Sequence, residues 1–404
     1  MSDLSRRAFL HASWLSSASL LLPRSGQAEP GRGNPVLICV FLRGAADGLS
    51  IVVPHAEDEY YRLRPTIAVP RPGARGGAID LDGRFGLHPR LKRLRPAWDA
   101  GQLALVHAAG SPHPTRSHFE AQDYMETAAV GDRSVSFGWL GRYFSAKPGA
   151  GGLRAVAVSS RAPLALRGYR DAVIAPSLRD FRLGASDELE PALAEGFRKL
   201  YRSDAGLAEG AGVRALDASS SVRRALRRQR VRGDYPRGMR ELADVVRLIK
   251  ADIGLETAWL DIGGWDTHRQ QGSVENGALP RQLERLGAAL SAMRADLGDH
   301  FARVTLLVMS EFGRTARENG TGGTDHGHGG VMLALGGNVK GGRVLGAFPG
   351  LAPEQLHENR DLPVTTDFRD VLAEACERHL GLADSSPLFP GYPIEPTRRP
   401  GIFG

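Results

Sequence analysis

Three residues that bind metal ions well lie within four positions of each other at Asp325, His326 and His328. Carboxylate oxygens and imidazole nitrogens are the side-chain ligands that zinc, manganese or magnesium ions use in proteins. Because Gly327 permits a sharp bend of the backbone, these side chains can converge on one ion. An Asp helix cap followed by surface histidines would show the same spacing. The spacing alone therefore leaves a metal site and a surface loop both open.

Further polar groups follow other apolar runs of the sequence. Asp47 follows the run at 36–42, Asp266 and His268 follow 256–261, and Glu311 follows 304–309. If these runs are parallel strands, their carboxyl ends meet at one edge of the sheet, where ligands bind in open α/β sheets. We therefore predict that Asp47, Asp266, His268 and the 325–328 segment form a divalent-metal site at this edge.

The segment 111–118 offers hydroxyl nucleophiles. Thr115, Ser117 and His118 stand at the predicted start of a helix, whose N–H groups stabilise an anion such as a transferring phosphoryl or sulfuryl group. A bound metal can make such a hydroxyl reactive. Ser117 and Glu120 also fit a capping box, which would give Ser117 a structural role. An attacking water would need neither hydroxyl.

Three arginines stand beside these polar clusters. Arg43, Arg116 and Arg314 each carry a guanidinium group that can bind a tetrahedral oxyanion through paired hydrogen bonds. The same arginines can instead pair with the neighbouring carboxylates.

The elements that must position these groups follow from hydrophobic patterning. Continuous apolar runs predict buried parallel strands, and amphipathic stretches between them predict helices. The predicted strands cover 36–42, 103–107, 155–158, 256–261, 304–309 and 331–335, and the predicted helices cover 117–129, 240–249, 278–297 and 369–380. This alternation predicts an α/β fold with a mostly parallel, helix-covered sheet. Residues 55–100 are rich in Pro, Gly and Arg, and residues 160–235 are mostly helical and charged with no strand pattern. Both segments are expected to be insertions that cap the sheet.

Composition excludes several classes of protein. The 404 residues are 42% hydrophobic and 24% charged, which excludes a disordered, collagen-like or coiled-coil chain. Two cysteines exclude a disulfide scaffold and a Cys-based zinc cluster. The net charge is +7, from 52 basic and 45 acidic residues, yet no basic run is interleaved with aromatics, so we expect no nucleic-acid partner. The arginines between 223 and 232 fit a solvated helix face or attraction to an anionic polymer or lipid.

The first 28 residues have the pattern of an export signal. Arg6 and Arg7 precede a weakly apolar run at 12–22, and small residues follow at 26–28. This predicts a twin-arginine signal peptide, although a basic amphipathic helix would look similar. The run is too short and too rich in serine to be a permanent membrane anchor. We therefore expect one domain over residues 29–404, recognition by the twin-arginine export machinery, and a periplasmic or secreted protein.

The leader and five internal motifs together closely resemble the exported bacterial family catalogued as domain of unknown function 1501. The internal motifs are FLRGAADG at 41–48, TRSHFEAQ at 115–122, GGWDTH at 263–268, SEFGRT at 310–315 and GTDHGHGG at 323–330. That family resembles a distant branch of the alkaline phosphatase and sulfatase superfamily. The resemblance implies an alkaline-phosphatase-like three-layer α/β/α sandwich with helical cap insertions and a site for one or two divalent metals.

The resemblance also implies roles for individual residues. Metal ligands would be Asp47, Asp266, His268, Glu311, Asp325, His326 and His328, and the nucleophile would be Thr115 or Ser117. The sequence departs from the superfamily in the short spacing of its middle Asp/His pair, in Phe312 after Glu311 where a histidine is expected, and in the lack of the cysteine that sulfatases modify.

Two functions are compatible with these features. The first is an exported metal-dependent hydrolase of an anionic ester, phosphate or sulfate, in which His268 or His328 binds metal or moves a proton. The second is a non-catalytic binding or assembly protein of the cell envelope. In either case the expected partner is an anionic small molecule or an envelope polymer.

Overall fold

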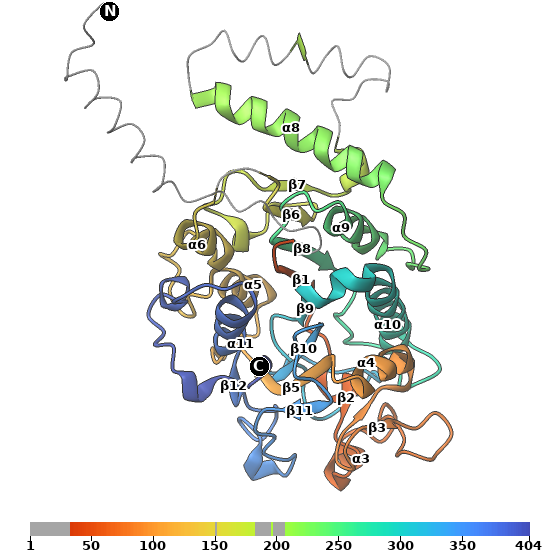
Figure 1. The fold of residues 1–404 in the computed structure, drawn as a ribbon. Helices are drawn as coiled ribbons and strands as arrows, with labels where there is room; N and C mark the ends of the chain where they lie inside the picture. Colours follow the sequence, from red (N-terminus) through yellow and green to blue (C-terminus); the bar gives the residue numbers. More distant parts are fainter. Residues whose placement is uncertain (1–32, 150–151, 182–194, 197–206) are drawn as a thin grey trace, which may run out of the picture. The chain divides into compact units, whose positions relative to one another are not determined.

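The apolar runs form the strands of one central sheet (Figure 1). The computed structural model describes residues 33–149, 152–181, 195–196 and 207–404. The sheet order is β11-β5-β10-β9-β1-β8-β6-β7, and β12 also pairs with β5. The strands are β1 (Val36–Leu42), β5 (Leu103–Gly110), β6 (Ala155–Val158), β7 (Val173–Ala175), β8 (Thr257–Ile262), β9 (Val304–Met309), β10 (Gly330–Gly336), β11 (Arg343–Leu345) and β12 (Thr366–Asp367).

Most neighbouring strands run parallel, as predicted. β1 lies between β8 and β9 and is parallel to both, with Val40 opposite Leu260 and Val308. β10 is the exception, because it is antiparallel to both β5 and β9. The chain passes from β9 to β10 through residues 310–329, which contain no helix. Parallel neighbours are usually joined through a helix that crosses one face of the sheet, and this helix-free connection instead returns the chain as an antiparallel neighbour.

Helices cover both faces of the sheet, which confirms the predicted three-layer α/β/α architecture (Figure 1). One face packs against α4 (Arg95–Asp99), α9 (Arg240–Lys250) and α10 (Ala278–Leu297). The other face packs against α5 (His118–Thr127), α6 (Trp139–Ala146) and α11 (Phe368–Glu374). β1 shows why both layers are needed: Ile38 and Val40 face the first layer, whereas Cys39 and Phe41 face the second.

The predicted insertions are built differently from each other. Residues 48–100 hold α2 (Gly48–Ile51), α3 (Asp58–Leu63) and a small sheet of β2 (Val52–Val53), β4 (Gly86–Leu87) and β3 (Ile79–Asp80). The expectation that 160–235 lacks strands is wrong, because β7 pairs in parallel with β6 at the edge of the central sheet. A strand of three residues is too short to give a periodic signal in the sequence. The long helix α8 (Leu207–Arg228) follows in this region.

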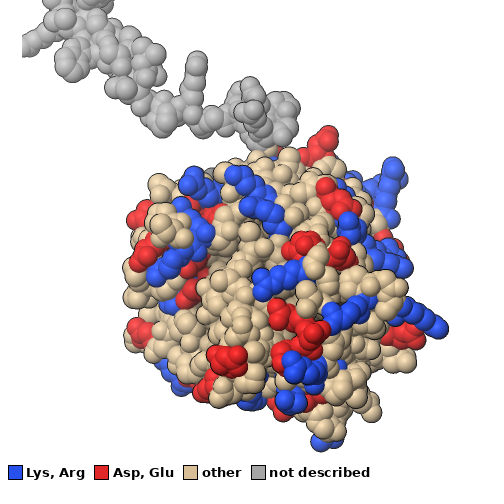
Figure 2. Space-filling view, turned by 90° about the horizontal axis from the view of Figure 1, so that it is seen from below, with Lys and Arg blue, Asp and Glu red and all other residues tan. Residues whose placement is uncertain are grey.

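The predicted export signal at 1–28 lies outside the described residues. Among the described residues, no helix has the length and apolar character needed to cross a membrane. Residues Asn34–Gly404 form one compact unit. On the face of the molecule drawn in Figure 2, acidic and basic side chains are interspersed, so the excess positive charge does not form a continuous basic region there.

Candidate functional site

Two loop segments after β9 and before β10 pair with each other and carry several candidate residues. Arg314 forms an antiparallel bridge with His326, and the Thr315 N–H donates to the carbonyl of Asp325 at 3.0 Å. A Cβ atom at Gly327 would lie 2.3 Å from the carbonyl carbon of Arg314. Gly327 is therefore required by the close approach of the two segments, and its φ is not positive.

His118, Asp266 and His326 form a group that could hold one metal ion. One ligand atom from each lies within 4.8 Å of the other two. Nε2 of His118 is 3.7 Å from Oδ2 of Asp266, and Nε2 of His326 is 3.7 Å from Oδ1. His268 approaches the same carboxylate, with its Nε2 3.2 Å from Asp266 Oδ1. We call these four residues the His-Asp group.

Hydrogen bonds at Nδ1 set the tautomers of two of these histidines. Nδ1 of His118 lies 2.8 Å from Oε1 of Glu311, and Nδ1 of His326 lies 2.8 Å from the main-chain oxygen of Arg116. An ionised carboxylate and a carbonyl oxygen only accept hydrogen bonds, so each Nδ1 carries the proton. Each neutral ring then presents a lone pair at Nε2. Nε2 of His118 is buried and has no hydrogen-bond partner.

His268 is held in the same way by Asp325. Its Nδ1 lies 2.9 Å from Oδ1 of Asp325, which also accepts a hydrogen bond from Asn319 at 3.0 Å. These hydrogen bonds lower the pKa of the Asp325 carboxyl. Nε2 of His268 then faces Nε2 of His326 at 2.9 Å. Burial lowers the pKa of His326, which favours the neutral ring. Two nitrogens at this separation need a proton or a metal ion between or beside them.

Glu311 is a buried carboxylate that orients His118. It accepts hydrogen bonds from His118, from the Gly44 N–H at 2.9 Å, from Gln122 at 2.9 Å and from Ser310 at 2.9 Å. Burial by itself would raise the pKa of Glu311, but the hydrogen bonds from His118 and Gln122 outweigh burial and lower it. With its acceptor sites used in this way, Glu311 supports a ligand instead of being one.

Arg314 is placed to hold the loops together. Its side chain is fully buried and donates to the carbonyl oxygens of Gly44, Ala45, Trp265 and Thr324. It also donates to Oδ1 of Asp266 at 2.5 Å. Burial raises the pKa of Asp266, but this contact with Arg314 outweighs burial and lowers the pKa. The predicted catalytic role of Arg314 in binding an oxyanion does not fit, because its donors are already used.

The structure does not bring Asp47 into the His-Asp group. Both of its oxygens are bound by the buried Arg64, at 2.6 and 3.0 Å, and one also accepts from Ser50 and Gln271. Burial raises the pKa of Asp47, and the charge and hydrogen bonds of Arg64 reverse this effect. Asp47 is the anion of a buried ion pair, so we leave it out of the candidate ligand set.

His328 also lies apart from the group. Its ring stacks on His357, with centroids 4.6 Å apart, and burial lowers its pKa to about 4. Positions i and i+2 of a regular extended segment would face the same side, so it is the irregular path of the chain between them that separates the two rings. His326 therefore reaches the group, whereas His328 packs elsewhere.

Neither predicted nucleophile has an activating base. The Thr115 hydroxyl donates to Oε2 of Glu120 at 2.5 Å, and the hydrogen bonds of Thr115, Arg133 and Tyr124 lower the pKa of Glu120 to about 2. A carboxylate with so low a pKa is a poor proton acceptor. Ser117 is the N-cap of α5 but makes no side-chain cap hydrogen bond, so the predicted capping box does not form. Thr115 instead accepts from the Ser117 N–H.

The other two arginines are paired with carboxylates, which is the alternative that the sequence left open. Arg43 contacts Asp261 and Glu126, each at 2.7 Å. Arg116 contacts Glu358 at 2.7 Å and Asp361 at 2.8 Å. Arg43 and Arg314 are therefore not free oxyanion-binding forks, whereas Arg116 contacts both carboxylates through Nη2 alone and its buried Nε has no hydrogen-bond partner.

Sequence reasoning missed Gln122, Asn319 and Arg64, and it gave His118 a catalytic role without considering it as a ligand. Gln122 stands four residues after His118 on α5, so both side chains lie on one helix face and reach Glu311 together. That spacing was visible in the sequence. Arg64 lies in a Pro- and Arg-rich segment, where nothing local distinguishes it from its neighbours.

Glu311→Gln tests whether Glu311 positions a metal ligand. The amide replaces one acceptor by a donor that faces other donors, so His118 loses its orientation. We expect zinc affinity to fall about 10- to 100-fold, measured by competition with a chromogenic chelator. Glu318→Gln is the control, because Glu318 also accepts several hydrogen bonds but contacts Thr66 and Ile67. Unchanged zinc affinity in Glu311→Gln would contradict the assignment.

Comparison with solved structures finds sulfatases at low similarity. The PsFucS1 sulfatase from Pseudoalteromonas sp. has a TM-score of 0.40 and 12% identity, covering 96% of this chain and 74% of that one. BT1596, a 2-O GAG sulfatase, has a TM-score of 0.36 and 10% identity, covering 91% and 74%. Similarity at this level supports no statement about activity. No curated protein matches the sequence. The family model described as "Protein of unknown function (DUF1501)" matches residues 35–389, and the chain therefore belongs to this family.

Proposed function

We propose that this protein is an exported metal-dependent hydrolase of an anionic ester, a phosphate or a sulfate, in the cell envelope. His118, Asp266 and His326 would hold the metal, and His268 stands next to them. When bound, a divalent metal supplies positive charge that stabilises the developing oxyanion. The export part of the proposal rests on the twin-arginine pattern of residues 1–28.

The observation that supports a metal most strongly is the convergence of imidazole lone pairs on one carboxylate. Nδ1 of each histidine is next to an acceptor, and the Nε2 atoms of His118, His268 and His326 all face Asp266. An orientation of this kind, fixed by outer carboxylate or carbonyl groups, is typical of metal-binding histidines. Because Arg43, Arg116 and Arg314 are already paired, a metal is also the charge still needed to bind an anionic ester.

The residues of the chain suggest how water would react. Since Thr115 and Ser117 lack a base, we propose that a water molecule attacks the phosphorus or sulfur atom. His268 is 41% exposed and is paired through Nδ1 with Asp325, so its Nε2 can take the proton of that water. Asp325 orients the ring and stabilises the imidazolium that forms, and the proton can then pass to the leaving oxygen. Phe312 stacks on His118 and shields that side of the group from solvent.

The test is a metal analysis followed by an activity screen. The mature protein, purified and reconstituted separately with Zn²⁺, Mn²⁺ and Mg²⁺, is analysed for bound metal and assayed with p-nitrophenyl phosphate and p-nitrophenyl sulfate. We expect about one equivalent of metal and turnover of one ester class that chelation abolishes and metal restores. His268→Ala should lose most of the turnover while it keeps His118, Asp266 and His326 as ligands.

Two results would contradict this proposal. A protein that binds no metal under these conditions would leave only a binding or assembly role for the strand-end loops. A protein that binds metal at full occupancy but hydrolyses neither ester would place the metal in a structural role.

A further inference from the structure

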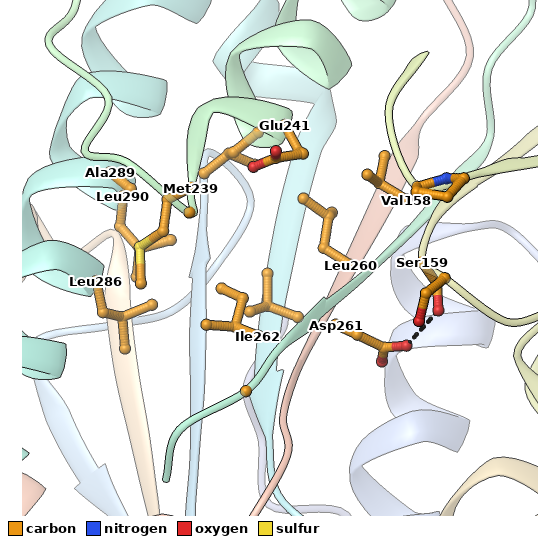
Figure 3. Close-up of a pocket in the computed structure, with 16 residues that line it drawn as sticks. Val158, Ser159, Met239, Glu241, Leu260, Asp261, Ile262, Leu286, Ala289 and Leu290 are labelled. Atoms are coloured by element: carbon orange, nitrogen blue, oxygen red, sulfur yellow. Dashed lines mark hydrogen bonds between the residues drawn. The ribbon is translucent and has the colours of Figure 1, made fainter. Parts of the chain in front are cut away.

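A pocket that is separate from the His-Asp group lies between the central sheet and the helices α9 and α10 (Figure 3). Its volume is about 360 Å³, within the lower part of the range of about 300–1,000 Å³ that is usual for small-ligand sites. Its floor consists of side chains from the ends of β1, β6 and β8, and its wall comes from α10. The apolar residues include Val40, Val158, Met239, Leu260, Leu286 and Leu290.

Polar groups occupy a different side of this pocket from the apolar wall. In Figure 3, Glu241 lies at the top and Ser159 and Asp261 lie on the right, while Met239, Leu286, Ala289 and Leu290 lie on the left. A ligand that fills the pocket therefore meets hydrocarbon on the left and in the middle of this view, and it meets the carboxylate of Glu241 at the top. This arrangement selects a small amphiphile.

The charges at the polar side are negative. Glu241 and Asp261 are the charged residues that line the pocket. The Asp261 carboxylate forms an ion pair with Arg43 at 2.7 Å and accepts hydrogen bonds from Ser159 at 2.6 Å and from Trp259 at 3.0 Å. Within the described part of the chain, the Glu241 carboxylate makes no hydrogen bond or ion pair.

The nearby cation does not neutralise Glu241 directly. The charge of Glu241 contributes to the raised pKa of Arg179, but the Arg179 guanidinium donates its hydrogen bonds to Asp244. Its Nε lies 2.9 and 3.3 Å from the two carboxylate oxygens of Asp244. The pocket therefore presents one carboxylate that lacks a direct partner, beside an apolar cavity. The Ser159 hydroxyl donates to Asp261 and accepts from the Arg161 N–H at 3.3 Å, which leaves one further lone pair on its oxygen. All these groups suit a ligand that donates hydrogen bonds and is positively charged.

We propose that this pocket binds a small primary amine with an aliphatic body. The ammonium group would donate to Glu241, and the hydrocarbon would lie against Leu260, Leu286 and Leu290. None of the four residues of the His-Asp group lines this pocket. The amine site is therefore separate from the proposed catalytic function, and either can fail without the other.

The test compares three ligands of equal length. n-Hexylamine, n-hexanol and hexanoate are titrated into the metal-free mature protein at pH 7.5 by isothermal titration calorimetry. We expect hexylamine to bind about fivefold more tightly than hexanol, the effect expected of a partly exposed charge pair, and hexanoate to bind most weakly. Equal affinities for hexylamine and hexanol, or tighter binding of hexanoate, would overturn the proposal.

Variants locate the binding in this pocket. Glu241→Gln should weaken hexylamine about fivefold and leave hexanol unchanged. Ala289→Phe fills the cavity and should abolish binding of both ligands. Glu354→Gln, an exposed glutamate on another turn, and His326→Ala, in the His-Asp group, should bind hexylamine as the parent protein does. Hexylamine affinity that survives Glu241→Gln, or that falls with His326→Ala, would place the amine elsewhere and overturn the proposal.

Discussion

His326→Ala is expected to lose its bound metal while the protein stays folded. The substitution removes one of the three members of the tightest ligand group, and His326 also connects His118 to His268. Loss of a direct ligand should reduce metal affinity by more than about 100-fold, because removing a residue that only hydrogen-bonds to a ligand already reduces metal affinity about 10- to 100-fold. Metal content by elemental analysis and affinity by chelator competition measure this effect.

The metal-free protein should respond differently to the same change. Without metal, the 2.9 Å contact between the Nε2 atoms of His268 and His326 needs a shared proton, and removing the His326 ring loses this contact and the hydrogen bond to the Arg116 carbonyl. The melting temperature of metal-free His326→Ala should therefore be close to or slightly below that of the metal-free parent, whereas the loss of metal affinity is large. His300→Ala, in which a partly exposed histidine outside the group is removed, should keep full metal content. A His326→Ala protein with parental metal affinity would show that the His-Asp group is not the metal site.

Asp47→Asn is expected to be the most destabilising single change at the strand ends. The amide leaves the fully buried Arg64 guanidinium without its counter-charge, and breaking one partner of a buried pair costs about 3–5 kcal/mol of the free energy of unfolding. Urea unfolding of the metal-free protein, followed by circular dichroism, measures the loss. Asp58→Asn is the matched control, because Asp58 pairs with Arg71 at the exposed surface and should cost at most about 1 kcal/mol.

This variant also separates two roles for Asp47. If Asp47 belongs only to the ion pair, Asp47→Asn protein that remains folded should bind metal with parental stoichiometry. The double variant Asp47→Leu, Arg64→Met should recover much of the lost stability, because it leaves no unpaired buried charge. An Asp47→Asn protein that is as stable as the parent but has lost its metal would instead make Asp47 a ligand.

The long elements of the fold could be predicted closely. The predicted strands at 36–42, 155–158 and 304–309 match β1, β6 and β9, and the predicted helix at 278–297 matches α10. Their signal is local, since a continuous apolar run or an amphipathic period is repeated over several residues. The closing helix predicted at 369–380 also matches in extent, although α11 ends at Glu374 and the helix continues to His379 as a π-helical turn. The short strands β7, β11 and β12 depend on pairing with a neighbour and leave no such signal.

Part of the candidate site could also be predicted, because it depends on where the long strands end. Asp266, His268, Asp325 and His326 were expected to meet, and the structure brings them together. The expectation rested on the rule that parallel strands end at one edge, which needs only the order of strands and loops. His328, two residues from His326, could not be separated from it in the sequence, because only the path of the loop decides which ring turns toward Asp266.

Residue types and their local spacing thus determined the layered α/β architecture and the set of groups available at the strand ends. The tertiary structure alone decided which partner each charged group takes. Asp47 pairs with Arg64, and His118 pairs with Glu311 across 193 positions of the chain. Arg314 donates its hydrogen bonds to the carbonyl oxygens of the loops that it joins. Hydrogen bonds and ion pairs depend on distances of a few ångströms between segments far apart in the chain. No periodicity within a single segment encodes those distances.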